Sequence, residues 1–447
     1  MWLVDIILLC FTIHFSLQII KTYGARTILL VYIFITFAQQ ILSIMYLNTG
    51  VFVYELNRTT YYVPESTPLF IFYTNFFLFF VYIFGRRYQK NFNYSDIEEL
   101  SKVSRIMCYG SVAFSVALAA YTLLDLVVSG IPIFVAAITH YNFYSTYSTL
   151  PFASTVNNWL SISMYFLGYA YVHIKKKGFR VTCVLIVILS MLIRFIMSYR
   201  MSGLINIPLN FLAVAFLLSK TNFKNIRQIL TPKRVFRISL ALILVLLAFI
   251  ISSIVSGRAS DISEAIEVFA NRAFGLGNHL WWAAEADNST GNDLFVHNLL
   301  NEFLVIFTGG NQYDTNSGVY YLMRQYGYSY IVNVDINHGI RYAATFITTV
   351  VYKWGYILCI FPIAIIARVL VWFINNFDRT VKKDHIVQFV LICKLLGTFS
   401  TYITSTGTLA EWMNPENYIY LILFILARYG FKKRSMIRKP ISGGRRI

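Results

Sequence analysis

Apolar residues in this chain come in blocks of about 20, the length that a helix needs to cross roughly 30 Å of hydrocarbon. Only 13% of the 447 residues are charged and 57% are hydrophobic, which leaves too few charges to cover a soluble globule. The sequence therefore predicts an all-α polytopic integral membrane protein with about 11 transmembrane helices. The expected spans are approximately 2–20, 27–47, 68–85, 106–129, 155–174, 181–199, 203–219, 236–256, 341–372, 386–403 and 417–429.

The first of these blocks has no basic segment before it and no small-residue cleavage site, so we expect a retained helix rather than a signal peptide. Most of the 38 lysines and arginines fall in alternate loops, and short cytoplasmic loops hold positive charge. This distribution predicts an outward N-terminus, a large outward loop at 257–340 and a basic cytoplasmic tail at 430–447. No linker divides the chain, so we expect one membrane domain over 1–447.

The net charge of +18 does not indicate a nucleic acid partner, because the basic residues are scattered over separated segments and form no single patch. The five cysteines lie within expected spans and are interpreted as small hydrophobic residues. His279, Glu285 and Asp287 match no metal-ligand spacing, and the 314–318 segment fails as a calcium loop. We therefore expect neither a metal nor a cofactor.

The 257–340 loop contains the main candidate site residues. Its Asp261–Phe274 segment has the apolar spacing of a surface helix, and the stretch at 287–318 is turn-forming and polar. Arginines, which outward segments normally lack, occur in and around this loop. A guanidinium group at headgroup level either pairs with a lipid phosphate or, as part of a converging cluster, binds a phosphate-bearing substrate. The arginines are Arg200, Arg258, Arg272, Arg324 and Arg341.

A histidine and two tryptophans of the same loop complete the predicted site. His338 lies near the end of the loop and is a candidate general base, because imidazole titrates near neutral pH; a structural hydrogen bond is the alternative. Trp281 and Trp282, like the tyrosines of the outward loops, either form a membrane-interface belt or stack on sugar rings.

Four basic residues lie inside the expected spans and at least four residues from either end, where a charge is costly and usually faces the bundle interior. They leave a transport route open, although the spans contain almost no carboxylates for an ion relay. They are Arg194, Lys353, Arg368 and Lys394.

Several short segments resemble the O-antigen polymerases (Wzy) and, more distantly, the O-antigen ligases (WaaL) of Gram-negative bacteria. They are Ser-Tyr-Arg-Met-Ser-Gly at 198–203, Ser-Gly-Arg at 256–258, Asn-Arg-Ala-Phe-Gly at 271–275, Asn-His-Gly at 337–339 and Lys-Trp-Gly-Tyr-Ile at 353–357. The large late outward loop with its arginines is also similar. Two features depart from the family: the histidine follows its asparagine, and an odd number of spans places the two termini on opposite sides.

The resemblance implies a metal-independent glycosyltransferase with a GT-C-like bundle, working on the periplasmic face of the bacterial inner membrane in lipopolysaccharide biosynthesis. Its substrates would be undecaprenyl-pyrophosphate-linked oligosaccharides, and its membrane partners a chain-length regulator and a flippase. Arg200, Arg258 and Arg272 would bind pyrophosphate, with Arg324 and Arg341 as further substrate contacts. His338, Glu267 or Asp335 would deprotonate the acceptor hydroxyl. A ligase, a lipid-linked oligosaccharide flippase or another transporter, and a membrane scaffold remain the alternatives.

Overall fold

The computed structural model describes residues 2–89, 102–132, 143–197, 201–218, 247, 250–251, 253–254, 259–287, 318–337, 342–382 and 386–437. Over these ranges the chain is almost entirely helical, apart from one two-stranded hairpin in which β1 (Phe52–Val53) pairs antiparallel with β2 (Arg58–Thr59). The bundle helices are α1 (Trp2–Tyr23), α2 (Val31–Leu47), α3 (Ser66–Gln89), α4 (Lys102–Ser129), α5 (Ala153–His173), α6 (Lys177–Ile196), α7 (Met201–Leu218), α15 (Phe346–Leu358), α16 (Ile360–Lys382), α17 (Ile386–Thr401) and α19 (Pro415–Ile437).

Shorter helices join or cover these. They are η1 (Gly24–Leu30), η2 (Tyr54–Leu56), η3 (Phe143–Tyr147), α10 (Ile262–Ala270), η4 (Asn271–Gly275), α11 (His279–Ala286), α13 (Val319–Tyr326), α14 (Ser329–Asn337), η6 (Tyr402–Thr406) and α18 (Leu409–Trp412).

Six helical stretches within the described ranges are long and apolar enough to cross a membrane. They are Leu3–Leu47, Ser66–Arg87, Ser104–Ser129, Lys177–Ile196, Ile360–Lys382 and Ile386–Ser405. On α6, Val181, Leu185, Ile188 and Leu192 recur every three or four residues and are each about half exposed, so one face of this helix is apolar and open. Such a face suits lipid, which supports an all-α membrane protein.

Most of the expected spans coincide with a helix. The first two, 2–20 and 27–47, are α1 and α2, separated by η1. The block at 236–256 lies mostly outside the described residues. The block at 341–372 contains α15, which is kinked at Gly355, and α16, where its candidate span begins at Ile360. The number of eleven crossings therefore stays a prediction.

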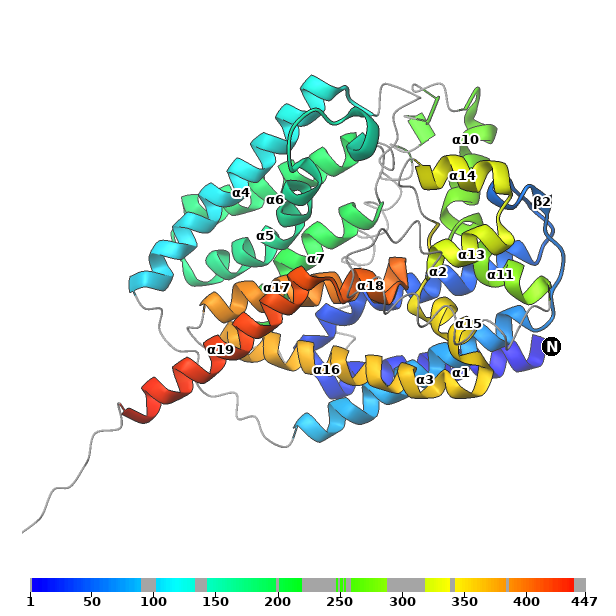
Figure 1. Ribbon diagram of the computed structural model, residues 1–447. Coiled ribbons are helices and arrows are strands. Elements are labelled where there is room, and N and C mark those ends of the chain that lie inside the picture. The colour runs from blue at the N-terminus through cyan, green and yellow to red at the C-terminus, as the bar shows by residue number, and fades with distance from the viewer. Residues whose placement is uncertain are drawn as a thin grey trace, which may run out of the picture.

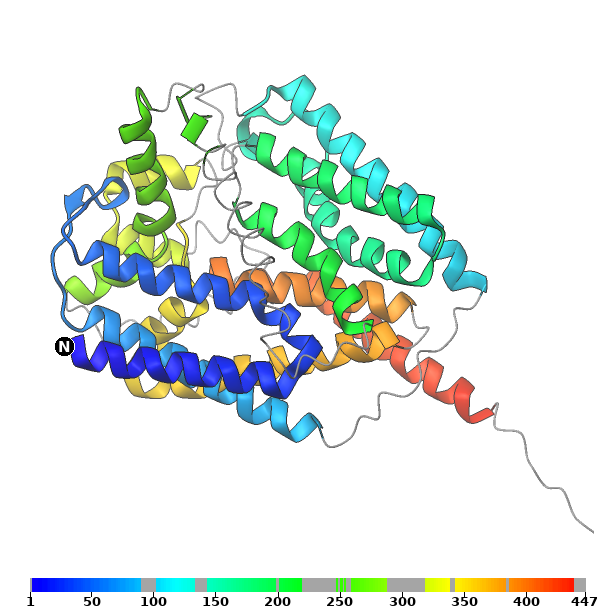
Figure 2. The ribbon, with the colours of Figure 1, turned by 180° about the vertical axis from the view of Figure 1, so that it is seen from behind.

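The long helices pack into one bundle with two parts (Figures 1 and 2). In the first part α1 packs on α3, α3 on α16, α16 on α17 and α17 on α19. In the second, α5 packs between α4 and α7, and α6 packs on α7. Helix α7 also contacts η1 and α16, which joins the two parts.

The helices of the large loop cover one end of this bundle. Figure 1 places α11, α13 and α14 at the end where α1 begins, whereas α19 runs to the opposite end. The loop helices share a hydrophobic core of their own with the hairpin, including Leu280, Met323 and Val53. The relative placement agrees with a loop and an N-terminus on one side and a C-terminus on the other; which side is periplasmic stays a prediction.

The predicted surface helix near Asp261 is confirmed. Helix α10 begins after this residue because its carboxylate accepts a hydrogen bond from the backbone nitrogen of Glu264 at 2.8 Å, which caps the helix. Ile262 and Ile266 are 62% and 50% exposed, so α10 lies on the surface.

Candidate functional site

Several predicted site residues lie outside the described part of the chain: Arg200, Arg258, His338 and Arg341. Arg272 belongs to η4, whose backbone is described although the side chain of the arginine is not. Segment η4 packs on α2, where the hydroxyl of Tyr46 donates to Asn271 at 2.8 Å. The convergence of these arginines therefore stays a prediction.

Of the predicted arginine set, Arg324 is the member whose side chain the structure describes. It lies in the last turn of α13 and is exposed. The same helix turns Tyr321, Leu322 and Tyr326 toward α15. Arg324 thus lies on the helix that forms one wall of the pocket described below.

Trp281 and Trp282 are both fully buried, with exposed fractions of 0%. The Trp281 indole donates to the backbone oxygen of Ser66 at 2.8 Å, and the Trp282 indole donates to Asn48 at 3.1 Å. These bonds satisfy the one polar group of each ring while the rest packs in the core. Neither ring has an open face for a sugar in this structure, so we assign both a packing role and leave them out of the proposed binding surface.

An ion pair fastens the hairpin to the end of α11. The Arg58 guanidinium lies 2.9 Å from the Asp287 carboxylate and also sits over the Trp282 ring, 5.2 Å from its centre. Both charged side chains are partly exposed. Arg58 is therefore engaged within the protein.

The chemically most distinctive group of the loop layer is Glu285 on α11, which is only 5% exposed. Its carboxylate accepts hydrogen bonds from the hydroxyl of Tyr352 at 2.8 Å and from that of Tyr356 at 3.0 and 3.2 Å. Burial raises the pKa of Glu285, while the two hydroxyl donors act to lower it. The two phenol hydroxyls therefore act as hydrogen-bond donors to this buried carboxylate.

The break in the helix at Gly355 lies between the two tyrosines. Gly355 has φ 69° and ψ 173°, a conformation that is essentially restricted to glycine. Beyond the break, the backbone oxygen of Tyr356 accepts a hydrogen bond from Tyr73 of α3 at 2.9 Å. The break therefore changes the direction of the chain within α15, between the part beside the loop helices and the last residues, which lead into α16 along α3.

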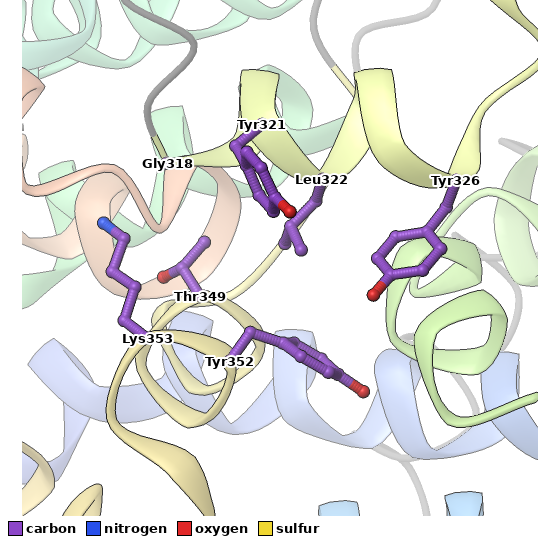
Figure 3. A pocket seen from close by; sticks show the side chains of 7 residues that line it. All are labelled: Gly318, Tyr321, Leu322, Tyr326, Thr349, Tyr352 and Lys353. Atoms are coloured by element: carbon purple, nitrogen blue, oxygen red, sulfur yellow. The ribbon is translucent and has the colours of Figure 1, made fainter. Parts of the chain in front are cut away.

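A pocket lies where α13 meets α15 (Figure 3). Tyr321 and Tyr326 reach into it from α13, while Tyr352 and Lys353 reach into it from α15. Its empty space is about 330 Å³, open solvent at the mouth included. Gly318, Leu322 and Thr349 complete the lining. The bond from Tyr352 to Glu285 connects the pocket to the buried carboxylate.

A second buried polar group lies at the start of α11. His279 is 1% exposed, its Nδ1 donates to the backbone oxygen of Leu276 at 3.3 Å, and its ring packs 5.0 Å from that of Tyr342. Burial lowers the pKa of His279 to about 4, so the ring is neutral at physiological pH. Its neighbour Asn278 accepts from Thr348 at 3.2 Å. This group ties α11 to the start of α15.

Metal chemistry has no candidate site in the described ranges, where no three His, Cys, Asp or Glu side chains gather. The arrangement instead offers an ammonium group, phenol hydroxyls and a buried carboxylate. Sequence reasoning considered Glu285 only as a metal ligand and Lys353 only as an intramembrane charge. The available signal was the position of Tyr352, Lys353 and Tyr356 around a glycine inside an apolar block.

Comparisons with known proteins leave the function open. A family model described as a family of unknown function (DUF6418) matches residues 312–421, which include α13, α15 and the pocket. The search of the curated proteins found no match. The search of the solved structures found none either.

Proposed function

We propose that this chain is a membrane glycosyltransferase of the O-antigen polymerase type, which joins lipid-linked oligosaccharide repeat units on the periplasmic face of a bacterial inner membrane. One observation carries the proposal. Helix α13 of the large loop and α15 form a small pocket of tyrosines and a lysine, and Tyr352 of this pocket donates to the buried carboxylate of Glu285 on α11. Groups of these kinds suit a reaction that binds sugars, deprotonates a hydroxyl and releases a phosphate.

The reaction requires one bond to form and one to break. A hydroxyl oxygen of the new repeat unit forms a bond to the anomeric carbon of the growing chain, and the bond from that carbon to pyrophosphate breaks. The bonding pair leaves with undecaprenyl pyrophosphate. The hydroxyl proton passes to a base, for which His338, Glu267 and Asp335 are the candidates from sequence.

Positive charge must meet the pyrophosphate as it departs. Arg200, Arg258 and Arg272 are proposed for this role, because guanidinium groups bind phosphate oxygens in pairs and stay protonated. Arg324 and Arg341 are proposed as further substrate contacts. A chain-length regulator and a flippase in the same membrane are proposed partners, since one would set the product length and the other would deliver the repeat units.

A ligase that moves finished polysaccharide onto lipid A core uses the same pyrophosphate chemistry, and it is kept as the second candidate for that reason. A transporter fits less well. A lipid-linked oligosaccharide flippase should have short outward loops, whereas the outward loop expected at 257–340 is large.

The test is the surface lipopolysaccharide of a strain that lacks the gene, resolved on a gel. It is repeated after complementation with the wild type and with Arg258→Ala, Arg272→Ala and His338→Ala. Arg87→Ala, an exposed arginine at the far end of α3, is the matched control. We expect core with a single repeat in the deletion strain, and a full ladder only with the wild type and the control. An unchanged ladder removes the polymerase assignment, and core without any repeat indicates the ligase or a flippase instead.

A further inference from the structure

Helix α16 runs away from the loop helices toward the opposite end of the bundle (Figure 1), and three arginines gather along it. Arg26 of η1 donates through Nη1 to the amide oxygen of Asn375 at 2.8 Å. Arg428 of α19 donates in the same way to the amide oxygen of Asn376 at 3.2 Å. Arg368 belongs to α16 itself and precedes Asn375 by about two turns, on the same face of the helix. Guanidinium groups from three different elements therefore surround one stretch of α16.

A tyrosine at the end of α1 brings two of these arginines to the same turn of α3. The Arg26 guanidinium lies over the Tyr23 ring, 5.4 Å from its centre. The Tyr23 hydroxyl donates to the backbone oxygen of Val81 at 2.9 Å. The Arg368 guanidinium lies over the ring of Phe84, which follows Val81 within one turn of α3, again 5.4 Å from the ring centre. The two positive charges thus flank one turn of α3, each against an uncharged ring.

These arginines carry positive charge that the neighbouring side chains do not neutralise. The groups that hold Arg26 are a backbone oxygen, an amide oxygen and a ring, all of them uncharged. Within the described ranges, no carboxylate pairs with Arg26, Arg368 or Arg428. Asp378, the one acid of α16, pairs instead with Lys382 at 2.7 Å. The stretch therefore has a surplus of positive charge, which favours the binding of an anion.

The depth of Arg368 indicates where that anion comes from. This residue belongs to the candidate span Ile360–Lys382, yet its side chain is exposed and therefore open to lipid. A long basic side chain in such a place extends toward the headgroups, where it meets phosphate oxygens. Guanidinium stays protonated and binds phosphate through paired hydrogen bonds. A phospholipid headgroup satisfies both the depth and the charge, and a lipid with net negative charge satisfies them best.

We infer that this stretch of α16 binds an anionic phospholipid of the leaflet opposite the loop helices. Exposed Arg368 contacts the phosphate. Arg26, which is 7% exposed, acts on the headgroup through its charge, and exposed Arg428 adds positive charge on the side of α19. The sequence expects this leaflet to be the cytoplasmic one. The inference goes beyond the proposed function and does not depend on it.

The experiment counts lipids bound to the full-length protein in detergent micelles by native mass spectrometry. The protein is titrated with phosphatidylglycerol, which is anionic, or with phosphatidylcholine, which is zwitterionic. We expect phosphatidylglycerol to bind more tightly, and excess inorganic phosphate to leave it bound. Equal affinities for the two lipids overturn the preference for net negative charge. Displacement by inorganic phosphate overturns the assignment to a lipid and indicates a free phosphate ligand instead.

Variants assign the binding to these residues. Arg368→Leu, which suits a position open to lipid, is expected to weaken phosphatidylglycerol about fivefold, the effect of one basic side chain at a membrane surface. Arg368→Lys keeps the charge but not the paired geometry and is expected to lose less. Arg105→Leu, which removes an exposed arginine at the start of α4, is the control and is expected to bind like the wild type. Wild-type affinity in Arg368→Leu, or an equal loss in the control, overturns the assignment.

Arg428→Gln is a second test that does not depend on the folding of Arg368→Leu, because it replaces an exposed side chain with a polar one. It is expected to weaken phosphatidylglycerol by less than Arg368→Leu and to leave phosphatidylcholine unchanged. An equal loss for both lipids would mean that the charge of Arg428 has no part in the site. The lipopolysaccharide ladder does not enter these measurements, so their outcome is independent of the polymerase proposal.

Discussion

Replacing Gly355 with alanine is expected to lower the free energy of unfolding by about 1–3 kcal/mol, the cost of a non-glycine residue in this backbone region. The residue has φ 69° and ψ 173°, and nothing lies within 4 Å of the position that a Cβ would take. Steric overlap therefore adds nothing, and the whole effect comes from backbone strain. The strain is relieved only if the helical segments on the two sides of Gly355 change their relative direction.

Alanine substitutions at two other glycines are expected to change stability by less and by more than Gly355→Ala. Gly110 in α4 also has nothing within 4 Å of an added Cβ, but its backbone is helical, so Gly110→Ala is expected to be neutral or to stabilise by up to about 1 kcal/mol. Gly407 has φ 54°, and an added Cβ would lie 2.7 Å from the backbone oxygen of Thr345. Gly407→Ala is therefore expected to cost more than Gly355→Ala, because overlap with backbone adds to the strain.

The assay is unfolding of the purified variants in mixed micelles, followed by tryptophan fluorescence during titration with a denaturing detergent. The expected order of destabilisation is Gly407→Ala, then Gly355→Ala, then Gly110→Ala. Identical midpoints for Gly355→Ala and Gly110→Ala would refute the reasoning, since the two differ only in backbone conformation. Loss of O-antigen ladder in Gly355→Ala, with the control intact, would further connect the break to the site.

Three further predictions concern the loop layer. Burial lowers the pKa of His279 to about 4 from an ordinary 6.5, so the unfolded chain binds a proton that the folded protein does not, and stability falls as pH falls from about 6.5 toward 4. At pH 5 this residue lowers the free energy of unfolding by about 2 kcal/mol. The loss of stability between pH 7 and pH 5 should therefore be smaller in His279→Gln than in the wild type. An equal pH dependence in the two proteins would contradict the burial argument. Arg58→Ala is expected to lower the free energy of unfolding by no more than about 2 kcal/mol, the sum of an exposed ion pair and a cation–π contact. High salt screens the ion pair, so the difference in stability between Arg58→Ala and the wild type should be smaller there. A difference that does not depend on salt would exclude the ion pair as its cause. Tyr356→Phe removes a hydroxyl that donates to Glu285 and is expected to cost about 1–3 kcal/mol, whereas Tyr330→Phe, whose side chain is 70% exposed, should unfold like the wild type. Matching midpoints for the two phenylalanine variants would mean that the bond to the carboxylate contributes nothing.

Helix type and approximate position could be predicted because hydrocarbon imposes one simple requirement, an apolar run of sufficient length. The α10 helix could also be predicted, since Asp261 caps the helix locally and the apolar spacing follows over a single short segment. Such features depend on neighbours in the sequence. They need no knowledge of which segments meet in space.

The side-chain roles depend on contacts between distant segments, and for that reason the sequence did not determine them. Trp282 was expected either at the membrane interface or against a sugar, yet its indole bonds to Asn48, a residue 234 positions away. The guanidinium of Arg58 could pair with any anion, and in the folded protein it bonds to Asp287, 229 positions away. Residue type gave the chemistry that each side chain can perform, but not the partner.

Lys353 shows how one local break governs both fold and site. Hydropathy is averaged over a window, so a lysine within an apolar block reads as a charge inside a span. The break at Gly355 interrupts that block before the candidate span starts at Ile360, so Tyr352 and Lys353 lie in a short helical segment beside the loop helices. Tyr352 and Lys353 then meet α13, while Tyr356, on the far side of the break, still reaches Glu285. Tyr352 and Tyr356 bond to the same carboxylate from the two sides of the kink at Gly355. A change in the backbone at Gly355 would move one hydroxyl relative to the other, which is why we expect Gly355 to affect the site as well as stability.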